Sequence, residues 1–114
     1  MSVSLNILED LSEGQTVLRI EGRLDATSSS LLENKLNGLF TANRIKVLID
    51  FSKIDYLSSA GMRVLLAATK KWKGMGGKLI FFSIGEDVME IIKMAGFERI
   101  LNISNNEIEA KKAA

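Results

Sequence analysis

The feature that most constrains the fold of this chain is an apolar run at residues 45–51, in which only Lys46 and Asp50 are charged. A run that is apolar on both faces is typical of a central strand covered by helices. Residues 52–57 follow it as a predicted short loop, and Ser58 and Ser59 then open a long amphipathic segment. The middle of the chain is therefore expected to form a buried strand, a loop and a helix, in that order.

The flanking sequence continues this succession of strands and helices. We expect strands at residues 3–8, 16–24, 78–84 and around 100–101, with a hairpin loop at 9–15. We expect helices from Thr27 or Ser28 to residue 40, from Ser59 to residue 73, over residues 85–95, and from a cap at Ser104 or Asn105 onward. The order β-β-α-β-α-β-α-β-α predicts one α/β domain with a mixed sheet covered by helices.

The chain lacks the residue types on which several kinds of active site depend. It contains no histidine and no cysteine, which excludes a Ser-His-Asp triad, a thiolate nucleophile and imidazole or thiolate metal ligands. Its 14 carboxylates include no pair at a diagnostic spacing. We therefore expect neither an enzyme nor a protein with a bound cofactor or metal.

The charge and hydropathy patterns indicate where the protein works. The net charge is +1, without the clustered basic excess of a nucleic-acid-binding protein, so no direct contact with nucleic acid is expected. No signal peptide follows Met1, and the longest apolar stretch, around residues 79–84, is too short to span a bilayer. We expect a soluble cytoplasmic domain with no membrane insertion.

Two motifs near the end of the central helix have alternative interpretations. The glycine-rich residues 74–77 and Lys78 resemble a phosphate loop in composition only, because they follow a helix and precede a strand. A helix stop and turn is the favoured interpretation. Lys70, Lys71, Lys73 and Lys78 could form a patch for phosphates or anionic lipid, but a solvated helix end is favoured for them.

Ser58 and Ser59 pose the main functional question. Serine is a preferred N-cap, so one of the two is expected to cap the central helix. The other, followed by the small residues Ala60 and Gly61, is available for another role, because a helix N-terminus has unpaired N–H groups and tolerates added negative charge. From the residues alone, a structural role and a phosphorylation site are equally supported.

The segment from the central strand into this helix closely resembles the signature of the STAS domain, specifically of the bacterial anti-sigma factor antagonists of partner-switching systems. The resemblance rests on residues 47–51 and 56–66 and covers nearly the whole chain, with weaker landmarks at residues 21–25, 77–79 and 94–97. It implies a single STAS domain over residues 1–114, an α/β fold with a mixed central sheet of about five strands and helices packed mainly on one face.

The resemblance also implies a phosphorylation switch. In the family, a serine protein kinase that doubles as an anti-sigma factor phosphorylates the serine before the small residue and the glycine, here Ser59; Ser58 stands where many members carry Asp. The unphosphorylated form binds the kinase and releases its client, and a serine phosphatase restores that form. Asp25 is expected near the serines, either on the docking surface or as a cap of the first helix. The expected partner-binding residues are Asp25, Ser58, Ser59, Ala60, Gly61, Met62 and Arg63.

Two other functions stay open. A nucleotide- or small-ligand-binding module would require a pocket at the Ser59 helix terminus, and a titration with GTP or ATP is the test. Fixed partners that are insensitive to substitution of Ser59 would instead indicate a STAS subunit of a transport or sensory complex.

Overall fold

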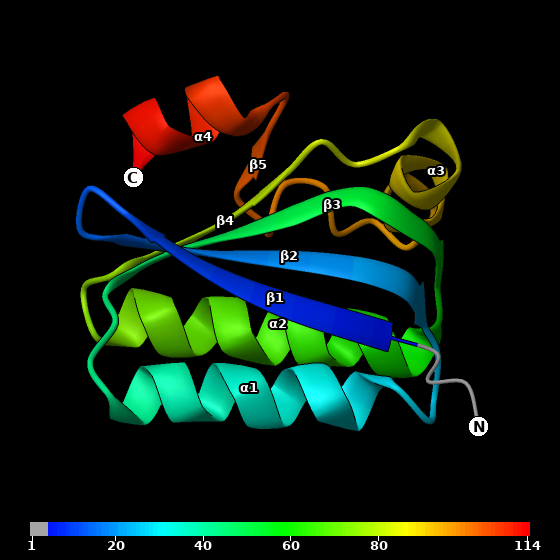
Figure 1. Cartoon of the computed structure of the whole chain (residues 1–114). Coiled ribbons are helices and arrows are strands. Elements are labelled where there is room, and N and C mark those ends of the chain that lie inside the picture. The colour runs from blue at the N-terminus through cyan, green and yellow to red at the C-terminus, as the bar shows by residue number, and fades with distance from the viewer. Residues whose placement is uncertain (1–4) are drawn as a thin grey trace.

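The computed structural model describes residues 5–114, which form a five-stranded sheet and four helices (Figure 1). The predicted order of elements and the α/β class are confirmed. The elements are β1 (Leu5–Ser12), β2 (Gln15–Leu24), α1 (Ser29–Thr41), β3 (Lys46–Leu57), α2 (Ser59–Gly74), β4 (Lys78–Phe82), α3 (Glu86–Met94), β5 (Ile103–Ser104) and α4 (Glu107–Ala113).

The strands lie in the sheet in their chain order, β1-β2-β3-β4-β5. β1 pairs antiparallel with β2 and the other neighbours pair parallel, so the sheet is mixed, as predicted. Right-handed crossovers that advance in one direction across a sheet lie on the same face of it. α1 and α2 accordingly lie side by side against one face, whereas α4 lies on the opposite side (Figure 1).

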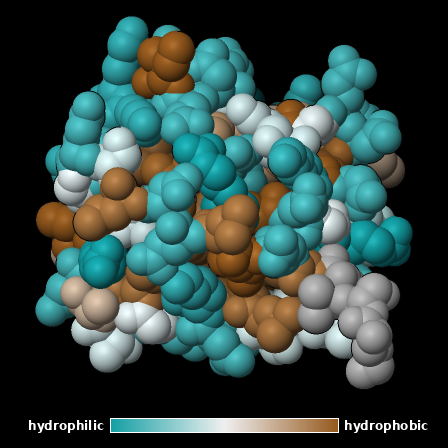
Figure 2. Space-filling view, viewed as in Figure 1, coloured by the Kyte–Doolittle hydropathy of each residue, from teal (hydrophilic) through white to brown (hydrophobic). Residues whose placement is uncertain are grey.

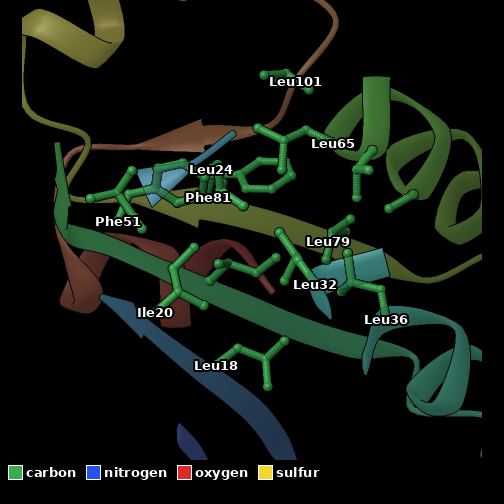
Figure 3. Packing of buried hydrophobic residues seen from close by; sticks show 14 of the residues in the cluster. Leu18, Ile20, Leu24, Leu32, Leu36, Phe51, Leu65, Leu79, Phe81 and Leu101 are labelled. Carbon is green, nitrogen blue, oxygen red and sulfur yellow. The ribbon is translucent and has the colours of Figure 1, made fainter. Parts of the chain in front are cut away.

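The side chains of β3 alternate between cores on the two faces of the sheet. Val47, Ile49 and Phe51 belong to the larger core, which the apolar sides of α1, α2 and α3 cover (Figure 3). Leu48 belongs to a smaller cluster on the other face, where Ala110 of α4 covers it. This arrangement confirms the predicted central buried strand and the helices packed mainly on one face.

The first hairpin turns later than the sequence predicts. β1 continues through residues expected to form a loop, and β2 begins already at Gln15. The turn consists of Glu13 and Gly14 alone, with φ of 53° and 77°. Left-handed backbone at both positions matches the twist of a two-stranded ribbon, which is why so short a turn suffices. Val3, within the predicted first strand, lies outside the described residues.

β3 is longer than predicted, because residues 52–57 continue the strand instead of forming a loop. Its buried residues Ile54 and Leu57 are three positions apart, which hides the usual alternation of a strand. The cause is the pairing with β2, whose register shifts at two points between Arg19 and Arg23. The strand therefore leads directly into the start of α2.

Several element ends also differ from the prediction. β4 ends at Phe82, because Ser83 has a left-handed φ of 57°. The fifth strand is β5, and the residues around 100–101 form a turn instead of the expected strand. Asn106 caps α4, one residue after the later of the two predicted caps, and its side chain accepts a backbone hydrogen bond in the first turn. α1 begins at Ser29, one residue later than expected.

Polar contacts around Arg19 of β2 fasten α4 to the sheet. The Arg19 guanidinium donates to both carboxylate oxygens of Glu107, at 2.9 and 3.0 Å, to Asp10 at 2.7 Å and to Asp50 at 3.1 Å. Hydrogen bonds from Arg19, and then from Lys111, lower the pKa of Glu107 to about 2. The hydrogen bonds to Glu107 and Asp10 raise the pKa of Arg19.

The surface of the sheet edge is partly apolar. β1 is an edge strand, and its Leu8 and Leu11 side chains are exposed. Apolar side chains also reach the surface between hydrophilic ones in the space-filling view (Figure 2). Within residues 5–114, no helix combines the length and the apolar character needed to cross a membrane.

Candidate functional site

Ser58 is the N-cap of α2. Its backbone is extended, with φ of −86° and ψ of 172°, and its Oγ accepts a hydrogen bond from the N–H of Gly61 at 3.1 Å. The N–H of Ser58 donates to the carbonyl of Leu24 at 2.8 Å, and its carbonyl accepts from the N–H of Met62 at 2.9 Å. Ser58 is therefore tied to the end of β2 and to the first turn of α2.

Ser59 has a different environment, although it is the next residue. It is the first helical residue of α2, its side chain is exposed, and its hydroxyl makes no hydrogen bond with any residue from 5 to 114. The N-terminus of a helix carries a positive partial charge, which favours an anion nearby. Of the two serines, Ser59 is thus the one with an accessible hydroxyl in a place that tolerates negative charge.

Gly61 serves the packing of α2 against the sheet. A Cβ atom built on it would lie 2.9 Å from Cδ1 of Leu57 and 3.0 Å from the carbonyl oxygen of Leu24. These distances are shorter than ordinary van der Waals contact, so any side chain would push α2 away from the ends of β2 and β3. Gly61 and Met62 are buried, whereas Arg63 is exposed and Ala60 is half-buried.

Asp25 organises the loop between β2 and α1. Its Oδ1 accepts hydrogen bonds from the N–H groups of Thr27 and Ser28, at 3.0 and 2.9 Å, and from the Ser28 hydroxyl. These bonds, the Ser28 backbone bond first, lower the pKa of the Asp25 carboxyl. These bonds close the turn that precedes α1, whose N-cap is Ser28 without a side-chain capping hydrogen bond, so Asp25 does not itself cap the helix and a role on the docking surface stays a prediction. The loop nevertheless lies beside the serines, because the preceding Leu24 holds Ser58.

A groove of about 460 Å³ opens beside Ser59. Its walls are mostly apolar and come from three places: the end of β3, the first two turns of α2, and α3 with the residues that follow it. The lining residues include Ser58, Ser59, Met62 and Arg63 from the predicted site, joined by Tyr56, Leu57, Leu66, Ile91, Ala95 and Phe97.

The sequence reasoning missed the part of the groove that α3 contributes. The sequence places Ile91 and Ala95 on the expected buried side of the third helix, but Ala95 is exposed and follows the end of α3, and nothing in the sequence indicates that both residues face the start of α2. Tyr56 was also missed as a site residue. Its exposed fraction of 38%, which is typical of a tyrosine on a contact surface, is visible only in the structure. The guanidinium of Arg23 lies 4.6 Å from the centre of the Tyr56 ring and helps to hold it.

Two arginines lie at the groove beside Ser59. Arg63 lies one helical turn after Ser59 and lines the same groove, and Arg23 stands over Tyr56 at its edge. Neither arginine forms an ion pair with the rest of residues 5–114. The same residues hold no group of three or more carboxylates placed to bind a metal ion. The site can thus accept an anionic group at Ser59 and an apolar segment in the groove.

The known proteins that this chain resembles include several named as anti-sigma factor antagonists. A Bordetella bronchiseptica protein, BtrV, whose name classes it with the anti-sigma factor antagonists, is 27% identical over 110 residues, or 96% of this chain and 94% of that protein. The crystal structure of an anti-sigma factor antagonist from Mycobacterium paratuberculosis has a TM-score of 0.88 at 21% identity, covering 96% of this chain and 93% of that one. The Bacillus cell fate determinant SpoIIAA in its phosphorylated form has a TM-score of 0.72 at 13% identity, covering 96% and 100%.

The family model for the STAS domain matches residues 6–110, which include β3, both serines and every wall of the groove. The mixed sheet, the helices on one face and the serine-capped α2 all fall within this match. The chain belongs to the STAS domain family.

Proposed function

We propose that this protein is an anti-sigma factor antagonist whose unphosphorylated form binds a serine protein kinase that is also an anti-sigma factor. Binding makes the kinase release its client, and phosphorylation of Ser59 ends the binding. The name of the Bordetella relative supports the regulatory class. The observation that carries the proposal is the separation of tasks between the serines: Ser58 is committed to the cap, and Ser59 is exposed without a hydrogen bond to residues 5–114.

The switch works through charge and bulk. A phosphoryl group adds about −1.5 to −2 charges at neutral pH. The positive end of α2 offsets part of that charge, and the Ser59 hydroxyl is not needed for folding, so the domain stays folded after phosphorylation. At the rim of the groove, the added group repels a partner that is complementary to the free hydroxyl. Because Ser59 is exposed, a serine phosphatase can reach it and restore the binding form.

The other predicted contact residues then divide into two groups. Ser59, Ala60 and Arg63 meet the partner, since they present surface at the groove or beside it. The remaining residues shape the surface from beneath: Ser58, Gly61 and Met62 in the first turn of α2, and Asp25 in the adjoining loop. The protein acts in this scheme by binding and not as an enzyme, and it works in the cytoplasm, where its kinase and client are located.

The test is an affinity capture from the lysate of the native organism, with wild-type protein and Ser59→Asp as parallel baits. Ser30→Asp is the matched control, because Ser30 is an exposed serine in the first turn of α1 and away from the groove. We expect the wild type and Ser30→Asp to capture a serine-kinase-like ATPase and Ser59→Asp to lose it. Equal capture by all three baits would exclude the switch and indicate a constitutive subunit of a transport or sensory complex.

The groove supports one alternative function. Its volume of about 460 Å³ is large enough for a small ligand, and its apolar walls with a few polar groups resemble ligand sites in general. A titration with GTP or ATP, followed by the chemical shifts of Tyr56 and Arg63, distinguishes this function. Saturable binding there, without capture of a kinase, would favour a nucleotide- or small-ligand-binding module.

A further inference from the structure

A second hollow lies at the other end of α2 from Ser59. It has a volume of about 410 Å³ and lies where the end of α2, the start of β4 and the turn after α3 come together. Each of these places contributes one cation: Lys73 from the last turn of α2, Lys78 as the first residue of β4, and Arg99 from the turn. All three side chains are exposed, and no carboxylate lines the hollow.

These cations have no charge partner within the described part of the chain. Lys73, Lys78 and Arg99 form no ion pair and no side-chain hydrogen bond with residues 5–114. Arg19 and Lys35 do form ion pairs, with Glu107 and Glu9, but unpaired cations also occur elsewhere, so it is the gathering of three of them around one hollow that sets this place apart. A concave site lined by unpaired charges of one sign concentrates the field and attracts ions of the opposite sign.

The end of α2 opposes this field only in part. The negative end of a helix is equivalent to about half an elementary charge, against three full charges on the side chains. Its terminal carbonyls are also occupied, since the N–H groups of Met75, Gly76 and Gly77 donate to carbonyls of the last turn. The helix end therefore offsets only a part of the three side-chain charges.

The turn between α2 and β4 brings Lys73 and Lys78 to the same hollow. A Cβ atom on Gly77 would lie 2.6 Å from the carbonyl oxygen of Ile45, so the backbone packs there as only glycine permits. A Cβ atom on Gly76, which lines the hollow, would meet nothing within 4 Å, so no neighbouring group fills the space beside it. The N–H of Gly77 donates to the carbonyl of Trp72 at 2.8 Å, which keeps Lys78 near the end of α2.

We propose that this hollow binds a soluble anion that carries two or more phosphate groups. Three cations on separate elements can each contact a different phosphate, whereas a singly charged anion gains little from one exposed cation. The concave shape favours a small soluble chain of phosphates over the flat surface of a membrane. The site is distinct from the groove beside Ser59, with which it shares no lining residue.

Trp72 provides the measurement, because it is the only tryptophan of the chain and lines the hollow. We would titrate the full chain with tripolyphosphate at low salt and follow Trp72 fluorescence and backbone amide chemical shifts. We expect saturable binding with shifts concentrated around Lys73, Lys78 and Arg99. The double variant Lys78→Gln/Arg99→Gln should bind about tenfold more weakly or worse.

The matched control is Lys93→Gln/Lys112→Gln, which loses the same charge at exposed positions outside the hollow. It should bind as the wild type does. Equal weakening in both double variants, or shifts spread over all basic residues, would show nonspecific attraction and overturn the proposal, as would no binding at all. ATP serves as a second probe: affinity equal to that of tripolyphosphate means that the phosphates alone are recognised, and tighter binding means that the nucleoside is contacted as well.

Discussion

The guanidinium of Arg19 in β2 holds both carboxylate oxygens of Glu107 in α4, at 2.9 and 3.0 Å, across 88 residues of sequence. The two charge-assisted bonds anchor the last helix to the sheet, on the face opposite α1 and α2. They also lower the pKa of Glu107 from its ordinary 4.5 to about 2. Because the folded pKa lies below the unfolded one, this carboxylate stabilises the fold at neutral pH, and its contribution is lost as the pH falls from about 5 toward 2.

Glu107→Gln should remove this part of the pH dependence. The variant is expected to be less stable than the wild type at pH 7, and the two unfolding free energies should converge as the pH approaches 2. Urea unfolding between pH 7 and pH 2.5 measures the difference. Glu109→Gln is the control, because Glu109 is more than half exposed and its carboxylate lies 4.0 Å from Lys112. If the unfolding free energies of Glu107→Gln and the wild type differed by the same amount at all pH values, the lowered pKa of Glu107 would be contradicted.

Replacement by alanine should lower the free energy of unfolding at Ser58 but hardly change it at Ser59. Ser58→Ala removes the side chain that caps α2 and should lower the free energy of unfolding by about 1 kcal/mol. Ser59→Ala removes an exposed hydroxyl and should change the free energy of unfolding by less than about 0.5 kcal/mol. Denaturant unfolding of both variants measures the two changes in the free energy of unfolding. If Ser59→Ala were the more destabilising, the cap assignment would be wrong.

Replacing two helix glycines with alanine should have opposite effects on the free energy of unfolding. Gly61→Ala places a Cβ atom against Leu57 and the backbone of Leu24, and should cost about 1–3 kcal/mol of stability through overpacking. Gly38→Ala, in α1, adds a Cβ atom that meets nothing within 4 Å and should stabilise the protein by about 0.5–1 kcal/mol. Thermal or denaturant unfolding tests both changes, and a loss of stability in both would argue against the close approach at Gly61.

The groove beside Ser59 can be tested without touching the serines. Ala95→Glu places a charge on the α3 wall and should weaken capture of the kinase about tenfold or more. Met94→Glu is the control, because Met94 is adjacent, 81% exposed and outside the groove. Both variants should unfold like the wild type. Unchanged capture by Ala95→Glu would place the partner elsewhere on the surface.

The succession of strands and helices could be predicted because α1, α2 and α3 have regular apolar sides, β3 and β4 have nearly continuous apolar runs, and β2 alternates. The end of β3 could not be predicted. Ile54 and Leu57 are buried three residues apart, and that spacing follows from register shifts against β2, which is a property of the pair and not of either strand alone.

Only the part of the candidate site that is continuous in sequence could be predicted. The serine turn is continuous in sequence, so Ser58, Ser59 and Arg63 could be named together, but the choice of cap depended on the extended backbone of Ser58. Ile91 and Phe97 complete the groove from a distant segment, and their place depends on how α3 crosses the sheet.

The division between Ser58 and Ser59 also has an evolutionary consequence. The side chain at position 58 accepts a capping hydrogen bond from the backbone, so replacement by a residue that cannot cap lowers stability, whereas aspartate, asparagine or threonine can keep the cap. Position 59 has no such constraint, because its side chain makes no capping hydrogen bond. Alanine, asparagine or aspartate fits an exposed first helical position equally well. A lineage could therefore acquire or discard regulation at this residue by a single mutation and inherit the same domain unchanged.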